Sequence, residues 1–276
     1  MRESFVRASL IMIVPVLAIW GCSAPETRGT PQAESTATAQ AQAQGSTASA
    51  QSRSSVAKAV ARSDDLAEFK LSYPEAVGAI PSLASLVEDR AREAEAEMRE
   101  AAREDRIAVE DSGGTFRPHH LSFEWEVVAD IPRLLSLSNS FATYTGGAHG
   151  MYGVQSLVWD RREGRALDGA ELFVSPAALR QALGERFCRA LDRERRERRG
   201  GDGRVGGAFD ECPPLTDLTI LVGSANNRTF DRLTLYAGPY VAGPYAEGAY
   251  EIDLPVDAAV LAAVRPEYRD QFSIGL

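Results

Sequence analysis

A seven-residue run, Tyr-Thr-Gly-Gly-Ala-His-Gly at residues 144–150, constrains the fold of this chain more than any other feature. Stretches rich in strand-forming residues flank it, at residues 134–143 and 152–160. Glycine reaches backbone conformations with positive φ that a side chain forbids, and tight connections between strands use such conformations. We therefore expect residues 144–150 to form a loop of defined shape between two β-strands.

His149 in this loop allows two interpretations. Imidazole titrates near neutral pH, so a histidine held among glycines can serve as a catalytic base or as a ligand. The same side chain can instead hydrogen-bond a neighbouring strand and stabilise a tight turn. The structural interpretation is favoured, because no carboxylate, cysteine or serine motif lies nearby in the sequence to complete a site.

The N-terminus resembles a bacterial lipoprotein signal peptide at residues 1–21. Arginines precede an apolar run, residues 8–20, which is short for a membrane span and is followed by Gly-Cys. This pattern predicts a lipid on Cys22 that holds the protein at a membrane. Ser23 then indicates the outer membrane, facing the periplasm, if the source is Gram-negative. A plain secretory signal and an uncleaved anchor are the alternatives.

The segment after Cys22 has a composition that cannot form a core. Residues 22–62 consist largely of Ala, Ser, Thr, Gln and Gly, which predicts a disordered linker. The remaining residues, 63–276, then form the folded domain. The net charge of -9 argues against a nucleic-acid partner, whose phosphates would be repelled.

The spacing of apolar residues predicts an α+β domain. A three- and four-residue spacing predicts a helix at residues 81–105, and Ser175 before Pro176 is a strong start for a second helix. The arginines at residues 195–199 suit the negative end of that helix. Alternation of apolar and polar residues predicts strands at residues 69–73, 121–127, 217–222, 230–235 and 250–254. We expect an antiparallel sheet packed by the two helices, with a disordered N-terminal tether.

The cysteines predict a disulfide, and the histidines predict neither a metal site nor a cofactor. Outside the cytosol, Cys188 and Cys212 are the pair left to form a bridge once Cys22 is lipidated. No histidine or further cysteine lies near this pair at the spacing of metal ligands. His119 and His120 are adjacent, so in an extended strand they point to opposite faces and cannot grip one metal ion.

A second unusual stretch follows at residues 235–248, Leu-Tyr-Ala-Gly-Pro-Tyr-Val-Ala-Gly-Pro-Tyr-Ala-Glu-Gly. Together with residues 144–150 it resembles the envelope domain shared by RsiV-type anti-sigma factors and the non-catalytic region of PdaC-type peptidoglycan deacetylases. Members of that family pair a YTGGAH loop with a later pY.vapYa.G segment, and the resemblance spans residues 69–256. The family's best-known activity is the binding of lysozyme.

The resemblance implies a domain and neither parent's full activity. In PdaC-type proteins the deacetylase chemistry belongs to a separate catalytic domain, and RsiV-type proteins need a spanning helix and a sigma-binding segment; we expect none of these here. The tyrosines of residues 235–248 can form a recognition surface or seal a sheet edge. The candidate binding residues are Tyr144, Thr145, Gly146, Gly147, His149, Tyr240 and Tyr245.

Three functions remain open on this basis. The first is an envelope lipoprotein with a non-catalytic domain that binds lysozyme-like muramidases or peptidoglycan, and an acidic surface would attract a basic lysozyme. The second is a small cell-wall hydrolase with His149 as base and Glu247 or Asp253 as its partner. The third is a structural protein of the envelope.

Overall fold

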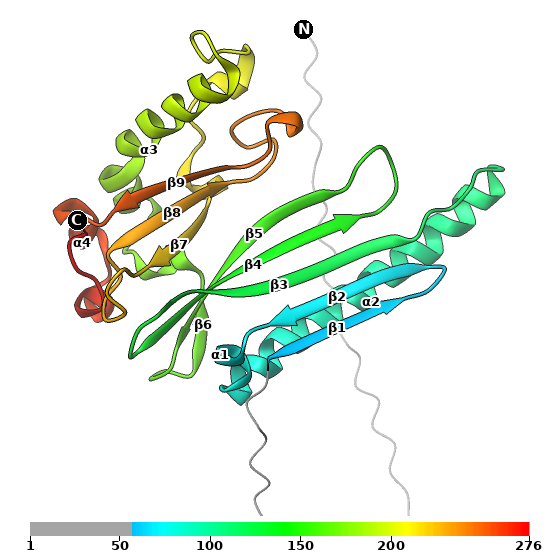
Figure 1. The fold of residues 1–276 in the computed structure, drawn as a ribbon, viewed down its shortest axis with the longest axis horizontal. Coiled ribbons are helices and arrows are strands. Elements are labelled where there is room, and N and C mark those ends of the chain that lie inside the picture. Colours follow the sequence, from blue (N-terminus) through cyan, green and yellow to red (C-terminus); the bar gives the residue numbers. More distant parts are fainter. Residues whose placement is uncertain (1–56, 276) are drawn as a thin grey trace, which may run out of the picture. The chain divides into compact units, whose positions relative to one another are not determined.

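The computed structural model of the protein describes residues 57–275. The predicted signal peptide, Cys22 and most of the predicted linker lie outside the described residues. The described chain has an α+β fold, as predicted, with a six-stranded sheet and a three-stranded sheet (Figure 1). None of the helices between residues 57 and 275 is long and apolar enough to cross a membrane.

The larger sheet takes its strands from the first half of the described chain, in sequence order. They are β1 (Lys58–Ser63), β2 (Ala67–Tyr73), β3 (His119–Asp130), β4 (Leu134–Tyr144), β5 (Met151–Asp160) and β6 (Arg165–Leu167). The expected all-antiparallel sheet is corrected at one place, because β2 and β3 are parallel. Between them, α1 (Glu75–Gly78) and α2 (Pro81–Asp111) form the crossover that a parallel pair requires.

Strand β1 lies, except for its last residue Ser63, inside the segment predicted to be linker. It pairs antiparallel with β2 from Lys58 opposite Tyr73 onward, so residues 58–62 are part of the sheet and not of a linker. Ion pairs with α2 tie it down: Lys58 Nζ lies 2.7 Å from Glu88 Oε1, and Arg62 bonds Glu95. Small and charged residues dominate this strand, so hydrophobic patterning gave no sign of it.

Helix α2 covers one face of the larger sheet (Figure 1). It extends six residues beyond its predicted end, to Asp111. Its apolar stripe, which includes Leu83 and Val87, packs on strand residues such as Phe69 and Trp125 to form one of two hydrophobic cores. Leu157 and Trp159 of β5 face this core as well.

The second core lies under the smaller, antiparallel sheet. That sheet contains β7 (Thr219–Gly223), β8 (Arg232–Ala237) and β9 (Tyr250–Pro255), and its helices are α3 (Pro176–Arg199) and α4 (Ala258–Ala263). Ser175 caps α3 as predicted, with Oγ accepting from the Ala178 N–H at 3.1 Å. The predicted disulfide between Cys188 and Cys212 is also present.

The smaller sheet packs on the face of the larger sheet that α2 leaves uncovered. Val158, which points away from Trp159 and Leu157, belongs to the second core. Thr219 Oγ1 of the smaller sheet donates to the carbonyl of Val154 at 2.7 Å. This contact covers only part of the face, and the remaining part, over β1 to β5, lines a groove.

Candidate functional site

The two unusual stretches of the sequence meet in space. The His149 ring stacks on Tyr245 with centroids 4.0 Å apart and an interplanar angle of 23°. The Tyr240 hydroxyl lies 3.3 Å from His149 Nε2, and Tyr152 of β5 packs edge-on against Tyr245 at 5.9 Å. We call His149, Tyr152, Tyr240 and Tyr245 the aromatic cluster.

The loop 144–150 connects β4 and β5 as predicted and presents His149 to solvent. Gly146 and Gly147 have φ values of +91° and +82°, which explains the need for glycine. His149 Nδ1 lies 2.9 Å from the Gly150 carbonyl and therefore carries the proton. Nε2 is then free to accept the hydrogen bond from Tyr240.

Tyr240 occupies a strained position in the second stretch. Its φ is +69°, a left-handed conformation that costs a residue other than glycine on the order of 1 kcal/mol or more. The turn is held by bonds from Tyr240 N to the Gly243 carbonyl and from Val241 N to the Gly238 carbonyl, both 3.1 Å. The residue is 48% exposed. Strain that presents an exposed aromatic ring is typical of a binding surface.

Arginines of α3 hold the second stretch in place, which sequence reasoning missed. The Arg195 side chain is 2% exposed, and its guanidinium donates to the Ala242 carbonyl at 2.8 and 3.1 Å and to the Glu211 carbonyl at 2.8 Å. Arg199 pairs with Glu247 at 2.9 Å. The helix dipole accounts for an arginine run at the end of a helix, and the spacing of these arginines contains no signal of their tertiary partners.

The structure does not bring the candidate catalytic carboxylates to His149. Glu247 is engaged by Arg199 and by the Tyr250 hydroxyl at 2.5 Å. Burial alone would raise the pKa of Glu247, but these two bonds outweigh it and lower the pKa. Asp253 accepts from Thr234 Oγ1 at 2.5 Å on the smaller sheet. The base and partner required by the hydrolase hypothesis are therefore not assembled from these residues.

The other histidines lie on opposite faces of β3, as the alternation predicted. His119 is buried, with Nε2 3.1 Å from Asp105 Oδ2, whereas His120 Nδ1 lies 3.6 Å from Glu68 Oε2. Within residues 57–275, no group of three or more His, Cys, Asp or Glu side chains is arranged to hold a metal ion.

The remaining candidate binding residues line a separate hollow of about 480 Å³. Tyr144, Thr145, Gly146 and Gly147 form one side of it, and Asp105 near the end of α2 is on the other. The Tyr144 hydroxyl donates to the Gly147 carbonyl at 3.2 Å, which stabilises the loop. These four residues thus shape the loop, while His149 contributes its ring to the aromatic cluster.

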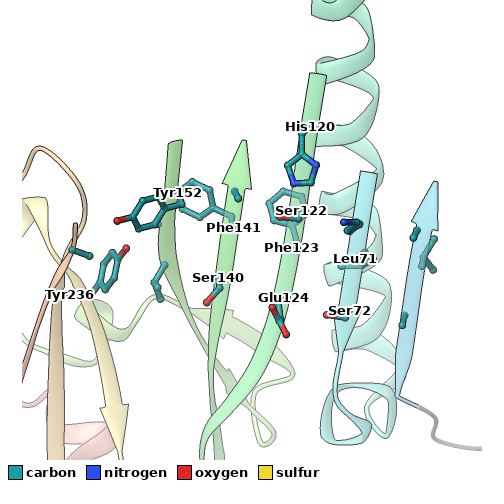
Figure 2. A pocket seen from close by; sticks show the side chains of 18 of the residues that line it. Leu71, Ser72, His120, Ser122, Phe123, Glu124, Ser140, Phe141, Tyr152 and Tyr236 are labelled. Atoms are coloured by element: carbon teal, nitrogen blue, oxygen red, sulfur yellow. The ribbon is translucent and has the colours of Figure 1, made fainter. Parts of the chain in front are cut away.

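A groove of about 710 Å³ adjoins the aromatic cluster and is lined by strands of both sheets. Figure 2 shows Tyr152 and Tyr236 on one side of it, and Ser122, Glu124 and Ser140 on the strands beside them. Burial and the neighbouring Tyr152 and Glu251 raise the pKa of Tyr236 to about 12, so its hydroxyl stays protonated. Because Tyr152 belongs to both, the groove and the cluster are continuous.

The strands that form the bottom of this groove are similar to a known protein family. Residues 60–152 match the family model of deacetylase PdaC. The PdaC-type region covers β1 to the start of β5, including the loop 144–150, and confirms the predicted resemblance over about a third of the chain. The second stretch, residues 235–248, lies beyond the PdaC-type region. No curated protein sequence matches the chain.

Two solved structures resemble the chain. A DUF3298 family member from Bacteroides fragilis is 19% identical, with a TM-score of 0.48, over 72% of this chain and 88% of that chain. A DUF3298 family protein from Pseudomonas aeruginosa is 18% identical, with a TM-score of 0.43, over 79% of this chain and 94% of that chain.

Replacing Tyr245 with alanine removes the ring on which His149 stacks. We expect this change to lower the free energy of unfolding by about 1 kcal/mol and to speed amide hydrogen exchange in residues 144–150, because an aromatic pair contributes about that much beyond its buried area. Tyr245→Phe keeps the ring and should leave the exchange unchanged. Equal exchange rates in wild type and Tyr245→Ala would show that the loop does not depend on the cluster.

Proposed function

We propose that this protein is a non-catalytic binding module of the bacterial envelope, and that its groove holds an extended glycan strand of peptidoglycan. The observation that supports this most is the continuity of the groove with an aromatic cluster built from both unusual stretches. Sugar rings pack their apolar faces on aromatic side chains such as Tyr152 and Tyr236. Their hydroxyls hydrogen-bond to serines and carboxylates, which Ser122, Ser140 and Glu124 supply in the groove.

The expected location follows from the N-terminal sequence. A lipid on Cys22 would anchor the domain to a membrane, and residue Ser23 favours the outer membrane with the domain in the periplasm. Peptidoglycan lies within reach of such an anchor. The similarity of residues 60–152 to a deacetylase family model agrees with an envelope role.

A lysozyme-like muramidase is the second candidate ligand, supported by a different observation. Three large residues are exposed at the start of β5 and in the second stretch. The exposed fraction is 39% for Met151, 37% for Tyr152 and 48% for Tyr240. Exposed tyrosines are typical centres of protein interfaces. The net charge of -9 would also speed encounter with a basic enzyme, so binding of this kind should weaken as salt rises.

Two further functions are separated by simple assays. A hydrolase that uses His149 would release products from muropeptides, and His149→Ala would abolish this turnover in a protein that still folds. A structural envelope protein would bind neither peptidoglycan nor muramidase. The module we propose binds without turnover. Its His149→Ala variant should still bind, with an affinity lowered only by the loss of one stacked ring.

A bulky side chain placed at the centre of the groove tests whether the groove is the binding site. Ser122→Trp places an indole on the open face of β3, and we expect it to reduce co-sedimentation with purified peptidoglycan at least about tenfold, since the occupied groove excludes a sugar ring. Ser85→Trp, on the exposed side of α2, is the matched control and should bind as wild type. If both variants bind peptidoglycan equally while circular dichroism shows both folded, the groove is not the site.

A further inference from the structure

A second cleft lies on the opposite face of the larger sheet from the groove. It measures about 400 Å³ and separates α2 from β3, β4 and β5. Its walls are largely apolar and include Val87 and Ala91 of α2 and Trp125 of β3. Trp125, Asn139 and Gln155 occupy one cross-strand row, so two carboxamide side chains lie next to the indole.

Asn139 is a buried polar side chain, and one of its two polar atoms has no hydrogen-bond partner among the described residues. The residue is 1% exposed, and its Nδ2 donates to Gln155 Oε1 at 3.0 Å. Its Oδ1 is buried and has no partner among the described residues. Buried polar atoms almost always have a hydrogen-bond partner, and a buried polar atom without a partner costs free energy of folding. The unpaired oxygen therefore points to a missing hydrogen-bond donor.

Gln155 partly supplies the chemistry that Asn139 requires. Its side chain is exposed, and its carboxamide makes one bond to Asn139 where two carboxamides placed edge to edge can make two. A primary amide has an N–H on the same side as its carbonyl. In the place of Gln155, such a group would accept from Nδ2 and donate to Oδ1 at once. A secondary amide in its usual trans form cannot do so, because its N–H and C=O point in opposite directions.

We propose that this cleft binds a small molecule with a primary carboxamide on an apolar body, and that the ligand displaces the Gln155 side chain from Asn139. The apolar body packs between α2 and Trp125, and the carboxamide completes the hydrogen bonds of Asn139. The site is on another face than the groove, so it goes beyond the proposed function and stands or falls separately from it.

Benzamide is a suitable probe, because it joins a primary carboxamide to a flat apolar ring. We expect saturable changes in the NMR signals of the Asn139 side-chain amide when benzamide is added to the protein. N-methylbenzamide, a trans secondary amide of nearly equal size, should bind at least about tenfold more weakly, the usual effect of losing a paired buried hydrogen bond. Ser122→Trp, which alters the groove, should leave benzamide binding unchanged.

The two carboxamide residues should act in opposite directions. Gln155→Ala removes the competing side chain and should tighten benzamide binding about threefold or more, whereas Asn139→Leu should abolish it. If Asn139→Leu does not fold, Gln155→Ala decides alone, since Gln155 is exposed and its replacement removes a single hydrogen bond. Three results would each overturn the proposal. The first is equal binding of benzamide and N-methylbenzamide, and the second is no saturable binding of benzamide by wild type or Gln155→Ala. The third is tighter binding of benzamide by wild type than by Gln155→Ala.

Discussion

Replacing Arg195 with methionine is expected to lower the free energy of unfolding by about 3–5 kcal/mol, because hydrogen bonds from a charged donor contribute about 1.5–3 kcal/mol each and two carbonyls lose bonds of this kind. The guanidinium is almost fully buried and donates to the carbonyls of Ala242 and Glu211. Methionine fills the space but donates no hydrogen bond, so the buried carbonyl of Ala242 loses both of its bonds from Arg195 and the part-buried carbonyl of Glu211 loses one. Urea denaturation followed by circular dichroism measures the change.

The neighbouring Arg196 provides the matched control. It belongs to the same helix and is exposed. Arg196→Met should therefore change stability by no more than about 0.5 kcal/mol. A loss below about 1 kcal/mol in Arg195→Met would mean that the second stretch is held by other contacts than this arginine. Faster hydrogen exchange at residues 238–249 in Arg195→Met alone would locate the damage at the site.

Removing the disulfide is expected to cost about 3 kcal/mol in the chain-entropy model for a loop of this length. Cys188 and Cys212 are separated by 24 residues, and the bridge ties α3 to the segment whose Glu211 carbonyl accepts from Arg195. Thermal unfolding of wild type with and without reductant, beside a double alanine variant, measures this cost. The double alanine variant should unfold at the same temperature as the reduced wild type, and reductant should not change that temperature.

The disulfide and Arg195 hold the same segment, so their effects should not add. We expect the loss in a variant that lacks both to be smaller than the sum of the two single losses by about 0.5 kcal/mol or more, as is usual for residues in one network. Strict additivity would show that the bridge and the arginine stabilise independent parts of the fold.

Local patterns in the sequence predicted the elements that depend on local physics. Ser175 and Pro176 start α3 because a cap and a proline need only their own turn. Alternation at residues 69–73 marked β2 because one face of that strand is buried. Strand β1 was missed because ion pairs hold it instead of an apolar face. The parallel pairing of β2 and β3 follows from the path of the crossover, which hydrophobic spacing does not record.

The site was predictable only where a motif marked it. The resemblance singled out His149, Tyr240 and Tyr245, and the structure brings their rings together. Tyr152 and the groove residues gave no signal, because they come from separate strands whose serines and tyrosines are ordinary in sequence. Their shared position depends on the register of the sheet and on how far the smaller sheet covers it.

Mapping by NMR chemical shifts where a soluble peptidoglycan glycan oligomer binds this protein tests the groove directly. We expect saturable changes that cluster at Ser122, Ser140 and Tyr152 and extend to Tyr245, with the exposed side of α2 unaffected. Changes confined to α2, or no saturable change anywhere in a folded sample, would contradict the claim that the open face of the larger sheet is the binding surface.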